Sequence, residues 1–206
     1  MGAGGTPDFR PGAGGEQALG APSVFLRLAG ARVGSPRRPS FQAAPAPGEH
    51  LVLSLLRAEH ARMLELAEEL LEAVRSIERR RGCGPGQAER LRSLAEALRS
   101  TERAHHAREE RLLFARLRRL GVCVPLDTLA REHEAIGARS EAVLLLVGRL
   151  AGGSPPRPGD RALLRSLCEQ VREHAFLEET ALYPFALDAI AAAEWDRMQV
   201  DWDAAG

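Results

Sequence analysis

The strongest constraint on the fold is a set of four segments in which apolar residues recur in steps of three and four. These segments run from Leu53 to Ile77, from Leu91 to Leu112, from Leu126 to Leu150 and from Leu164 to Phe185, and the second is the least regular. Such steps keep side chains on one face of an α-helix, whereas a half-buried strand alternates at every second residue. The pattern therefore predicts four amphipathic helices and an all-α fold.

Short breakers separate the four segments. Gly- and Pro-containing stretches lie at residues 82–86, 121–125 and 152–156, and such stretches typically form loops. Because the loops are short, consecutive helices should run antiparallel. Aromatic residues make up only 4% of the chain, so leucine, alanine and valine must build most of the core. The sequence predicts an antiparallel up-down-up-down four-helix bundle.

The composition of the chain changes near residue 48. Residues 1–48 hold 10 Gly and 7 Pro, about 35% of the segment, which exceeds the roughly 25–30% typical of low-complexity chains. We expect a disordered or loosely docked tail there. Weaker interpretations are an organellar transit peptide in the acid-poor stretch 17–48 and myristoylation at Gly2. We assign residues 49–188 to the bundle and residues 189–206 to a C-terminal extension that forms a short helix.

The charge and cysteine content argue against several partners. The chain carries 28 acidic and 28 basic side chains, so its formal net charge is zero, and it offers no general field for nucleic acid or an acidic membrane surface. It has no run of about 18 apolar residues that could span a bilayer. Three cysteines cannot form a disulfide framework and suit a reducing compartment. We expect a cytoplasmic protein; no feature indicates its oligomeric state.

Each apolar stripe contains one histidine at a core-facing step, and two of these histidines are followed four residues later by a glutamate. The six residues are His60, His105, Glu109, His133, His174 and Glu178. Residues four apart lie on one helix face, so each His/Glu pair points the same way. A single histidine on such a stripe is usually a core residue with a satisfied partner. If all six residues were ordinary core residues, each of the six polar side chains would need its own partner, because burying them unpaired is costly.

The six residues are also expected at one depth in the bundle. Residues at equal depth in an antiparallel hairpin are equidistant from its turn, and the midpoints between successive histidine positions fall in or beside the three predicted loops. Imidazole and carboxylate ligands suit iron, manganese or zinc, and six ligands exceed the four of a tetrahedral zinc site. A dinuclear centre with bridging carboxylates fits better. A ferritin-like site needs two Glu-x-x-His pairs, and Glu102 with His105 forms the only one.

The order His, His-x-x-x-Glu, His, His-x-x-x-Glu resembles the hemerythrin-like cation-binding domain, often called the HHE domain. The matching words are Leu56-Arg-Ala-Glu-His60, His105-His-Ala-Arg-Glu-Glu-Arg-Leu-Leu-Phe114, Arg131-Glu-His133 and His174-Ala-Phe-Leu-Glu-Glu-Thr-Ala-Leu-Tyr-Pro184. The resemblance covers about residues 49–188. It implies two non-haem irons sharing an oxo or hydroxo bridge, with the four histidines as terminal ligands and Glu109 and Glu178 as bridging carboxylates. Manganese and zinc are weaker alternatives.

One position departs from the oxygen-carrying hemerythrins that this chain resembles. Their third helix carries a second histidine four residues after the first, where this chain has Gly137. Counting the bonds of two octahedral irons then leaves about two positions open for water, O2, peroxide or NO. We interpret Gly137 as leaving room beside one metal for such a ligand, or as a glycine tolerated for close helix packing.

The resemblance therefore implies a di-iron protein, and we expect it to handle O2, peroxide or NO, with a link to iron or to oxidative and nitrosative stress. The resemblance also implies that it could supply iron to damaged iron–sulfur clusters, as some relatives do. The alternatives are a metal- or gas-sensing binding module without turnover and a structural bundle without metal. No general base or substrate pocket is identifiable, so whether the protein is an enzyme stays open.

Other residues are expected outside the site. His106 lies about 100° around the helix from His105, which predicts a solvent-facing side chain. His50 is expected to be a surface or capping residue at the start of the first helix. Tyr183 is the only tyrosine and is expected to act in packing. Cys168 lies too far along its helix from Glu178 to share a metal.

Overall fold

The computed structural model describes residues 50–80, 82–122 and 124–203, so the predictions made for the tail at residues 1–48 fall outside the described residues. All regular secondary structure in the described part is helical. The elements are α2 (Leu51–Arg80), α3 (Pro85–Arg108), η1 (Glu109–Phe114), α4 (Ala115–Arg119), α5 (Leu126–Ala151), α6 (Asp160–Leu177), η2 (Glu178–Leu182), α7 (Tyr183–Ala189) and α8 (Ala192–Asp203).

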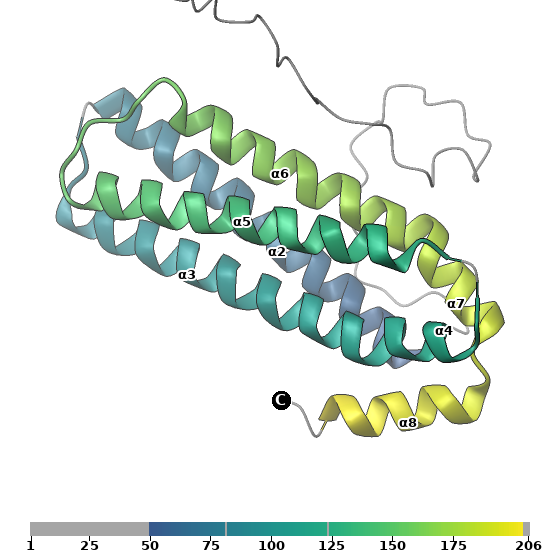
Figure 1. The fold of residues 1–206 in the computed structure, drawn as a ribbon. Coiled ribbons are helices and arrows are strands. Elements are labelled where there is room, and N and C mark those ends of the chain that lie inside the picture. Colours follow the sequence, from purple (N-terminus) through teal and green to yellow (C-terminus); the bar gives the residue numbers. More distant parts are fainter. Residues whose placement is uncertain (1–49, 81, 123, 204–206) are drawn as a thin grey trace, which may run out of the picture. The chain divides into compact units, whose positions relative to one another are not determined.

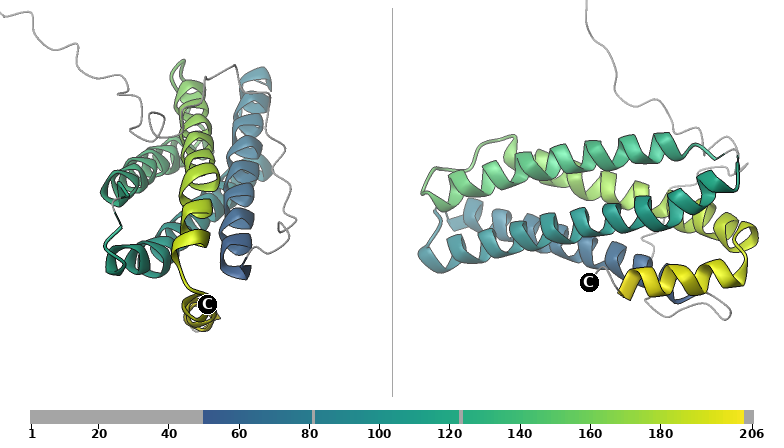
Figure 2. Two further views of the ribbon diagram at one scale, coloured as in Figure 1. Left: turned by 90° about the vertical axis from the view of Figure 1, so that its right-hand side faces the viewer. Right: turned by 60° about the horizontal axis from the view of Figure 1, so that its bottom comes forward.

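The predicted four-helix bundle is confirmed. Its four rods are α2, the continuous α3–η1–α4, α5, and the continuous α6–η2–α7 (Figure 1). Consecutive rods pack against each other and α6 returns to α2, so the order around the bundle is cyclic. The view along the bundle in Figure 2 shows this arrangement with α8 outside it. None of the helices described here is both long enough and apolar enough to cross a bilayer.

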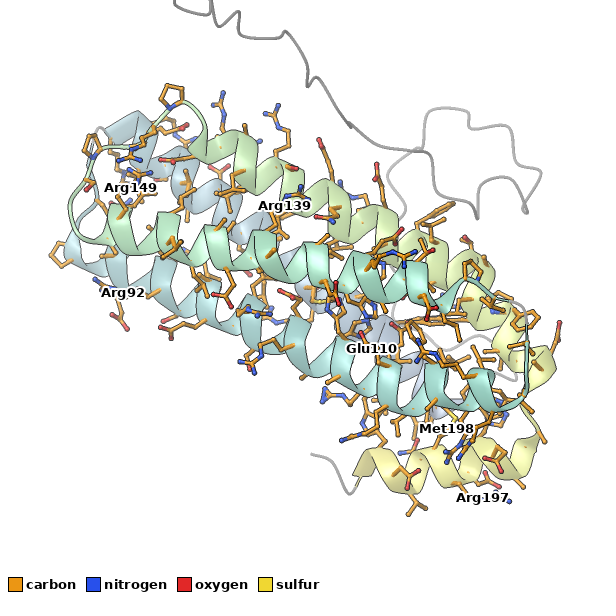
Figure 3. All side chains as sticks on the ribbon, in the orientation of Figure 1. Arg92, Glu110, Arg139, Arg149, Arg197 and Met198 are labelled. Atoms are coloured by element: carbon orange, nitrogen blue, oxygen red, sulfur yellow. The ribbon has the colours of Figure 1, made fainter. Side chains whose placement is uncertain are left out.

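The three loops lie where the sequence breakers predicted them. Two of them contain a glycine with positive φ, 67° at Gly121 and 86° at Gly153, a conformation that side chains with a Cβ rarely adopt. Arg149, labelled in Figure 3 near the end of α5, pairs with Asp160 at the start of α6. This ion pair links the two helix ends that flank the third loop.

The apolar core fills the half of the bundle nearest the α2–α3 and α5–α6 loops. Its members are drawn from residues 63–77, 91–98, 136–150 and 164–171, and most are Leu, Val, Ile or Ala. Beyond this core, in the other half of the bundle, lie the predicted histidines and glutamates. They are covered from the far side by buried residues that include Leu53, Phe114 and Tyr183.

Two π-helical segments, η1 and η2, interrupt the second and fourth rods, and the sequence analysis did not predict them. Each begins at a predicted bridging carboxylate, Glu109 or Glu178. In the fourth rod, Pro184 comes just after η2. Proline has no N–H and clashes with the carbonyl four residues earlier in a regular α-helix, so the wider π turn accommodates it. π segments of this kind are frequent at functional sites.

The π segment also corrects the predicted core positions of the fourth rod. Steps of three and four from Glu178 predicted that Ala181 and Phe185 face the core. The structure instead buries Leu182 and Ala186, one residue later in each case, and leaves Phe185 exposed. The inserted residue of the π turn rotates the following helix by one position.

The C-terminal extension contains α8, which packs against α2 and η1. Trp195 and Met198 are its buried residues, and the indole N–H of Trp195 donates a hydrogen bond to the carbonyl of Ile190 at 3.1 Å. The ring of His50, just before α2, stacks on Trp195 with centroids 5.0 Å apart. His50 lies at the start of α2, as predicted, where its carbonyl accepts from the N–H of Leu53 at 3.0 Å, and its side chain is half-buried against α8.

Candidate metal centre

The six predicted site residues all lie buried inside the bundle, with exposed fractions between 0% and 4%. They come from all four rods. His60 belongs to α2, His105 and Glu109 to α3 and the start of η1, His133 to α5, and His174 and Glu178 to α6 and the start of η2. The structure therefore brings together every residue that the sequence pattern proposed as a ligand.

Their donor atoms form two groups that share one carboxylate. The first group is His60, His105 and Glu178, and the second is Glu109, His133, His174 and Glu178; the donor atoms of each lie within 4.8 Å of one another. Glu178 Oε2 lies 3.1 Å from Nε2 of His60. Its other oxygen, Oε1, lies 3.0 Å from Nε2 of His174. The two oxygens of Glu178 face different groups, which is the arrangement of a bridging carboxylate.

Glu109 has a similar position between the groups. Its Oε2 lies 3.3 Å from Nε2 of His133 and 3.9 Å from Nε2 of His105. Two carboxylates therefore lie between two pairs of imidazoles in the centre of the bundle.

Eight buried polar atoms of this cluster have no hydrogen-bond partner. They are Nε2 of each of the four histidines and both carboxylate oxygens of Glu109 and of Glu178. Leaving such atoms unsatisfied is costly, and most buried polar atoms in proteins do have a partner. All eight belong to residue types that bind divalent metals. The donor set thus fits two cations better than a metal-free core.

A second carboxylate lies on the outer side of each histidine. The pairs, with Nδ1–oxygen distances, are His60 with Glu179 at 2.8 Å, His105 with Glu59 at 3.1 Å, His133 with Glu110 at 2.7 Å and His174 with Glu132 at 3.0 Å. A carboxylate can only accept, so each Nδ1 donates its proton outward. In the neutral form of each ring, which is the form that binds a metal, the lone pair of Nε2 then points into the site.

These four outer glutamates form a closed ring around the bundle. Each lies on the rod next to that of its histidine, and each is the direct chain neighbour of a predicted ligand. One of them, Glu110, lies between the second and third rods in Figure 3. The apolar stripes did not predict a role for them, although an acidic residue adjoins a predicted ligand in every stripe.

Burial and mutual proximity shift the pKa values of the metal-free site. Burial, followed by the charge of Glu178, raises the pKa of Glu109 to about 7. Burial alone would lower the pKa of His60, but the nearby Glu178 and Glu179 outweigh it and raise the pKa to about 9. The same opposition, with Glu109 and Glu178 as the carboxylates, raises the pKa of His133 to about 10. Without metal, protons on these imidazoles balance the carboxylates, and cations would replace them.

The prediction that His106 faces solvent is wrong. Its side chain is buried, with 8% of the residue exposed, and its ring stacks on that of His133 with centroids 3.9 Å apart. The reason is that α3 packs against both α2 and α5, so its buried arc spans more than the 100° that separates His105 from His106. Burial, followed by the charges of His133 and His174, lowers the pKa of His106 to about 2.

Tyr183 packs directly against the site. It is fully buried, and its ring lies parallel to that of His60 with centroids 5.9 Å apart. Burial, reinforced by the charges of Glu109 and Glu178, raises the pKa of its hydroxyl well above the usual value. The expected packing role fits this position, and the neutral ring shields one side of the first donor group.

A groove between α3 and α5 leads to the second donor group. Its volume is about 960 Å³, and its lining includes Arg99, Glu102, His106, His133 and Gly137. A Cβ atom at residue 137 would lie 3.3 Å from Oε1 of Glu102. The space that Gly137 was expected to leave beside a metal therefore contains the Glu102 carboxylate, and both residues line the groove.

Comparison with known proteins agrees with this geometry. The model of the Hemerythrin HHE cation binding domain matches residues 51–186, which span all four rods of the bundle. No curated protein matched the chain.

Proposed function

Since this chain belongs to the hemerythrin HHE cation-binding domain family, we propose that it is a non-haem di-iron protein that binds or turns over O2, peroxide or NO. The observation that carries this proposal is the set of eight buried donor atoms without hydrogen-bond partners, divided into two groups that share Glu178. Two metal positions account for both the number and the division of these atoms.

The chemistry of the donors favours iron among the available metals. The set contains only imidazole nitrogens and carboxylate oxygens, which suit iron, manganese or zinc. No thiolate is at hand in the described residues around the site, because Cys168 lies in the apolar core and burial raises its pKa to about 11. Zinc sites usually have four ligands in a tetrahedron, whereas six residues converge here. Iron when bound would supply redox chemistry toward O2, peroxide or NO.

The protein's own residues contribute orientation, shielding and access. The outer glutamates hold each histidine in the tautomer that aims Nε2 inward. Tyr183 and Phe114 cover the site from the side away from the apolar core, where both are fully buried. The groove between α3 and α5, lined in part by His106 and His133, is the side from which a diatomic molecule or peroxide would approach the second position.

Elemental analysis of the purified, iron-supplemented protein tests the proposal. We expect about two irons per chain, because two donor groups share a bridging carboxylate. In Glu178→Ala both groups lose a donor, so the iron content should fall to one or fewer per chain. Glu169→Ala, at an exposed residue of α6 in the same rod, is the matched control and should keep two. A single zinc, or no metal after iron supplementation, would refute the proposal.

A second candidate function is a metal- or gas-sensing module without turnover. It is favoured by a series of contacts that connects the site to α8. Arg108 pairs with Glu59, which holds His105, and its guanidinium lies 4.8 Å from the ring centroid of Trp202 on α8. A change at the metal could therefore reach the C-terminal helix. Peroxide or NO consumption by the iron-loaded protein favours the first function. Its absence, together with metal-dependent hydrogen-exchange protection of α8, favours the second.

We also propose a cytoplasmic location. The support is the chemistry of the cysteines: Cys83 and Cys168 are free thiols, as expected of a protein kept in a reducing compartment.

A further inference from the structure

Arginines hold the two outer glutamates of the first donor group, Glu179 and Glu59. Arg57 donates to Glu179 at 2.9 Å, and Arg108 pairs with Glu59. Each glutamate therefore has one oxygen toward its histidine and the other toward an arginine. The glutamate side chains are mostly buried, with 13% and 16% exposed. Charge-assisted hydrogen bonds are strong, and burial protects them from screening, so both carboxylates are fixed in place.

Each of these arginines also lies over an aromatic ring. The guanidinium carbon of Arg57 is 5.4 Å from the ring centroid of Tyr183, and that of Arg108 is 4.8 Å from the ring centroid of Trp202. A guanidinium within about 6 Å of a ring centroid is attracted to the face of the ring. The first metal position is thus supported twice by the same series of side chains: histidine, glutamate, arginine and aromatic ring.

The outer glutamates of the second donor group have no such support. Glu110 and Glu132 accept from His133 and His174, but neither pairs with an arginine in the part of the chain that the structure describes. Their side chains are 43% and 28% exposed. Water can therefore compete for their oxygens, and their carboxylates are held only by the histidines that they orient.

The groove between α3 and α5 lies on the same side as this weaker support. Among the described residues that line it are His133 and its partner Glu110, and no other predicted ligand belongs to the lining. The groove is thus next to a histidine whose outer partner is exposed to water. Solvent access and weak support coincide at the second position.

We propose that the two metal positions differ in how fast they exchange their ions: the first retains its ion, and the second releases and rebinds its ion on the side of the groove. This inference rests on the proposed function. An ion leaves when an imidazole turns away from it, which breaks the Nδ1 hydrogen bond that orients the ring. At the first position that bond ends on a carboxylate fixed by an arginine. At the second position the carboxylate is free to follow the ring or to accept from water.

The test uses the full-length protein loaded anaerobically with Fe(II) and mixed with an excess of a chelator that forms a coloured Fe(II) complex. The parent should release its two ions in two phases of equal amplitude, with the slow phase on the order of tenfold slower or more. Arg57→Gln and Arg108→Gln should each accelerate the slow phase and leave the fast phase unchanged. Glu110→Ala should accelerate the fast phase alone. Arg62→Gln, at an exposed residue of α2, is the control and should change neither phase.

A crystal structure of the half-depleted parent identifies the retained ion without any variant. Anomalous scattering from iron should place that ion beside His60 and His105, and iron beside His133 and His174 would overturn the proposal.

The other outcomes separate this proposal from the proposed function. If the parent releases both ions in one phase, or if the two arginine variants leave the slow phase unchanged, the positions do not differ as proposed, while the dinuclear site stands. If the arginine variants accelerate both phases equally, the arginines stabilise the bundle as a whole and the proposal is again overturned. If the parent binds fewer than two irons per chain, the proposed function fails and this inference fails with it.

Discussion

At the residue scale, the site depends on which ring nitrogen of each histidine carries the proton. Four carboxylates from neighbouring rods accept from Nδ1 at 2.7–3.1 Å, which leaves each Nε2 free to bind a cation. The ligands therefore do not act alone, because each is held by a residue that never touches the metal. Removing such an outer partner typically weakens metal binding by about 10–100-fold.

Glu132 and Glu134, the two chain neighbours of His133, offer a matched test of this arrangement. Glu132 accepts from Nδ1 of His174 at 3.0 Å, whereas Glu134 is exposed. We expect Glu132→Ala to weaken iron binding by roughly 10–100-fold and Glu134→Ala to leave it unchanged. Competition with a chelator of known affinity measures both values. Equal affinities for the two variants would mean that the outer carboxylates do not support the ligands.

The spacing of the sequence was enough to predict the six residues but not their surroundings. Steps of three and four place His60 or His133 on a core-facing stripe, and the loops then fix their common depth. The prediction for His106 was wrong because one apolar stripe describes only one packed face of a helix. Helix α3 packs against both α2 and α5, so a wider part of its surface is buried. The outer glutamates were missed because adjacent residues on a helix point about 100° apart. Only the packing of the next rod shows that this direction also leads to the site.

At the element scale, the positions of the helices were predictable and their internal irregularities were not. Breakers such as the glycines at residues 82 and 121 mark loops by local chemistry alone. A π segment leaves no such mark, because the apolar residues on either side of it each keep a helical period. Only their relative phase changes by one residue, as at Leu182 and Ala186. Pro184 was the one local signal of the irregularity.

The C-terminal helix makes a separate contribution to stability. Trp195 is 1% exposed and stacks on His50, so it anchors α8 to the start of α2. Trp195→Ala should lower the free energy of unfolding by about 3–5 kcal/mol, as large-to-small core substitutions do. Val200→Ala on the same helix removes a side chain from a residue that is 68% exposed, and should change it by less than about 0.5 kcal/mol. Denaturant unfolding measures both; similar small effects would show that α8 contributes little.

At the scale of the whole molecule, the bundle combines an apolar half with a polar layer whose buried carboxylates need either bound cations or protonated imidazoles to balance their charge. The apolar half follows from the stripes of the sequence and explains why an all-α bundle was predictable. Burial of the polar layer, in contrast, costs free energy, since the carboxylates of Glu109 and Glu178 are fully buried beside each other. Burial would raise the pKa of Glu178, yet the nearby His174 and His133 hold it well below the usual value. The metal-free fold therefore relies on protonated imidazoles.

This reliance predicts how the stability of the metal-free protein varies with pH. The pKa values of His60 and His133, about 9 and about 10 in the fold, lie above the value of about 6.5 in an unfolded chain. The folded state then binds more protons than the unfolded state, and stability falls as pH rises. The contribution is complete below pH of about 6.5 and disappears as the pH passes through the folded-state values. His105 and His106, whose pKa values are lowered, act only on the acidic side of this range.

The melting temperature of the chelated protein should accordingly fall between about pH 7 and pH 9, within the range that the two raised pKa values define. The iron-loaded protein should melt higher and show little of this decline, because the cations replace the protons on these imidazoles. His50→Ala, which removes a histidine outside the site, should keep the slope of the metal-free parent. Parallel curves for the loaded and chelated forms, or a chelated form insensitive to pH, would mean that protons do not compensate the buried carboxylates. Thermal unfolding followed by circular dichroism, with metal content checked at each pH, decides between these outcomes.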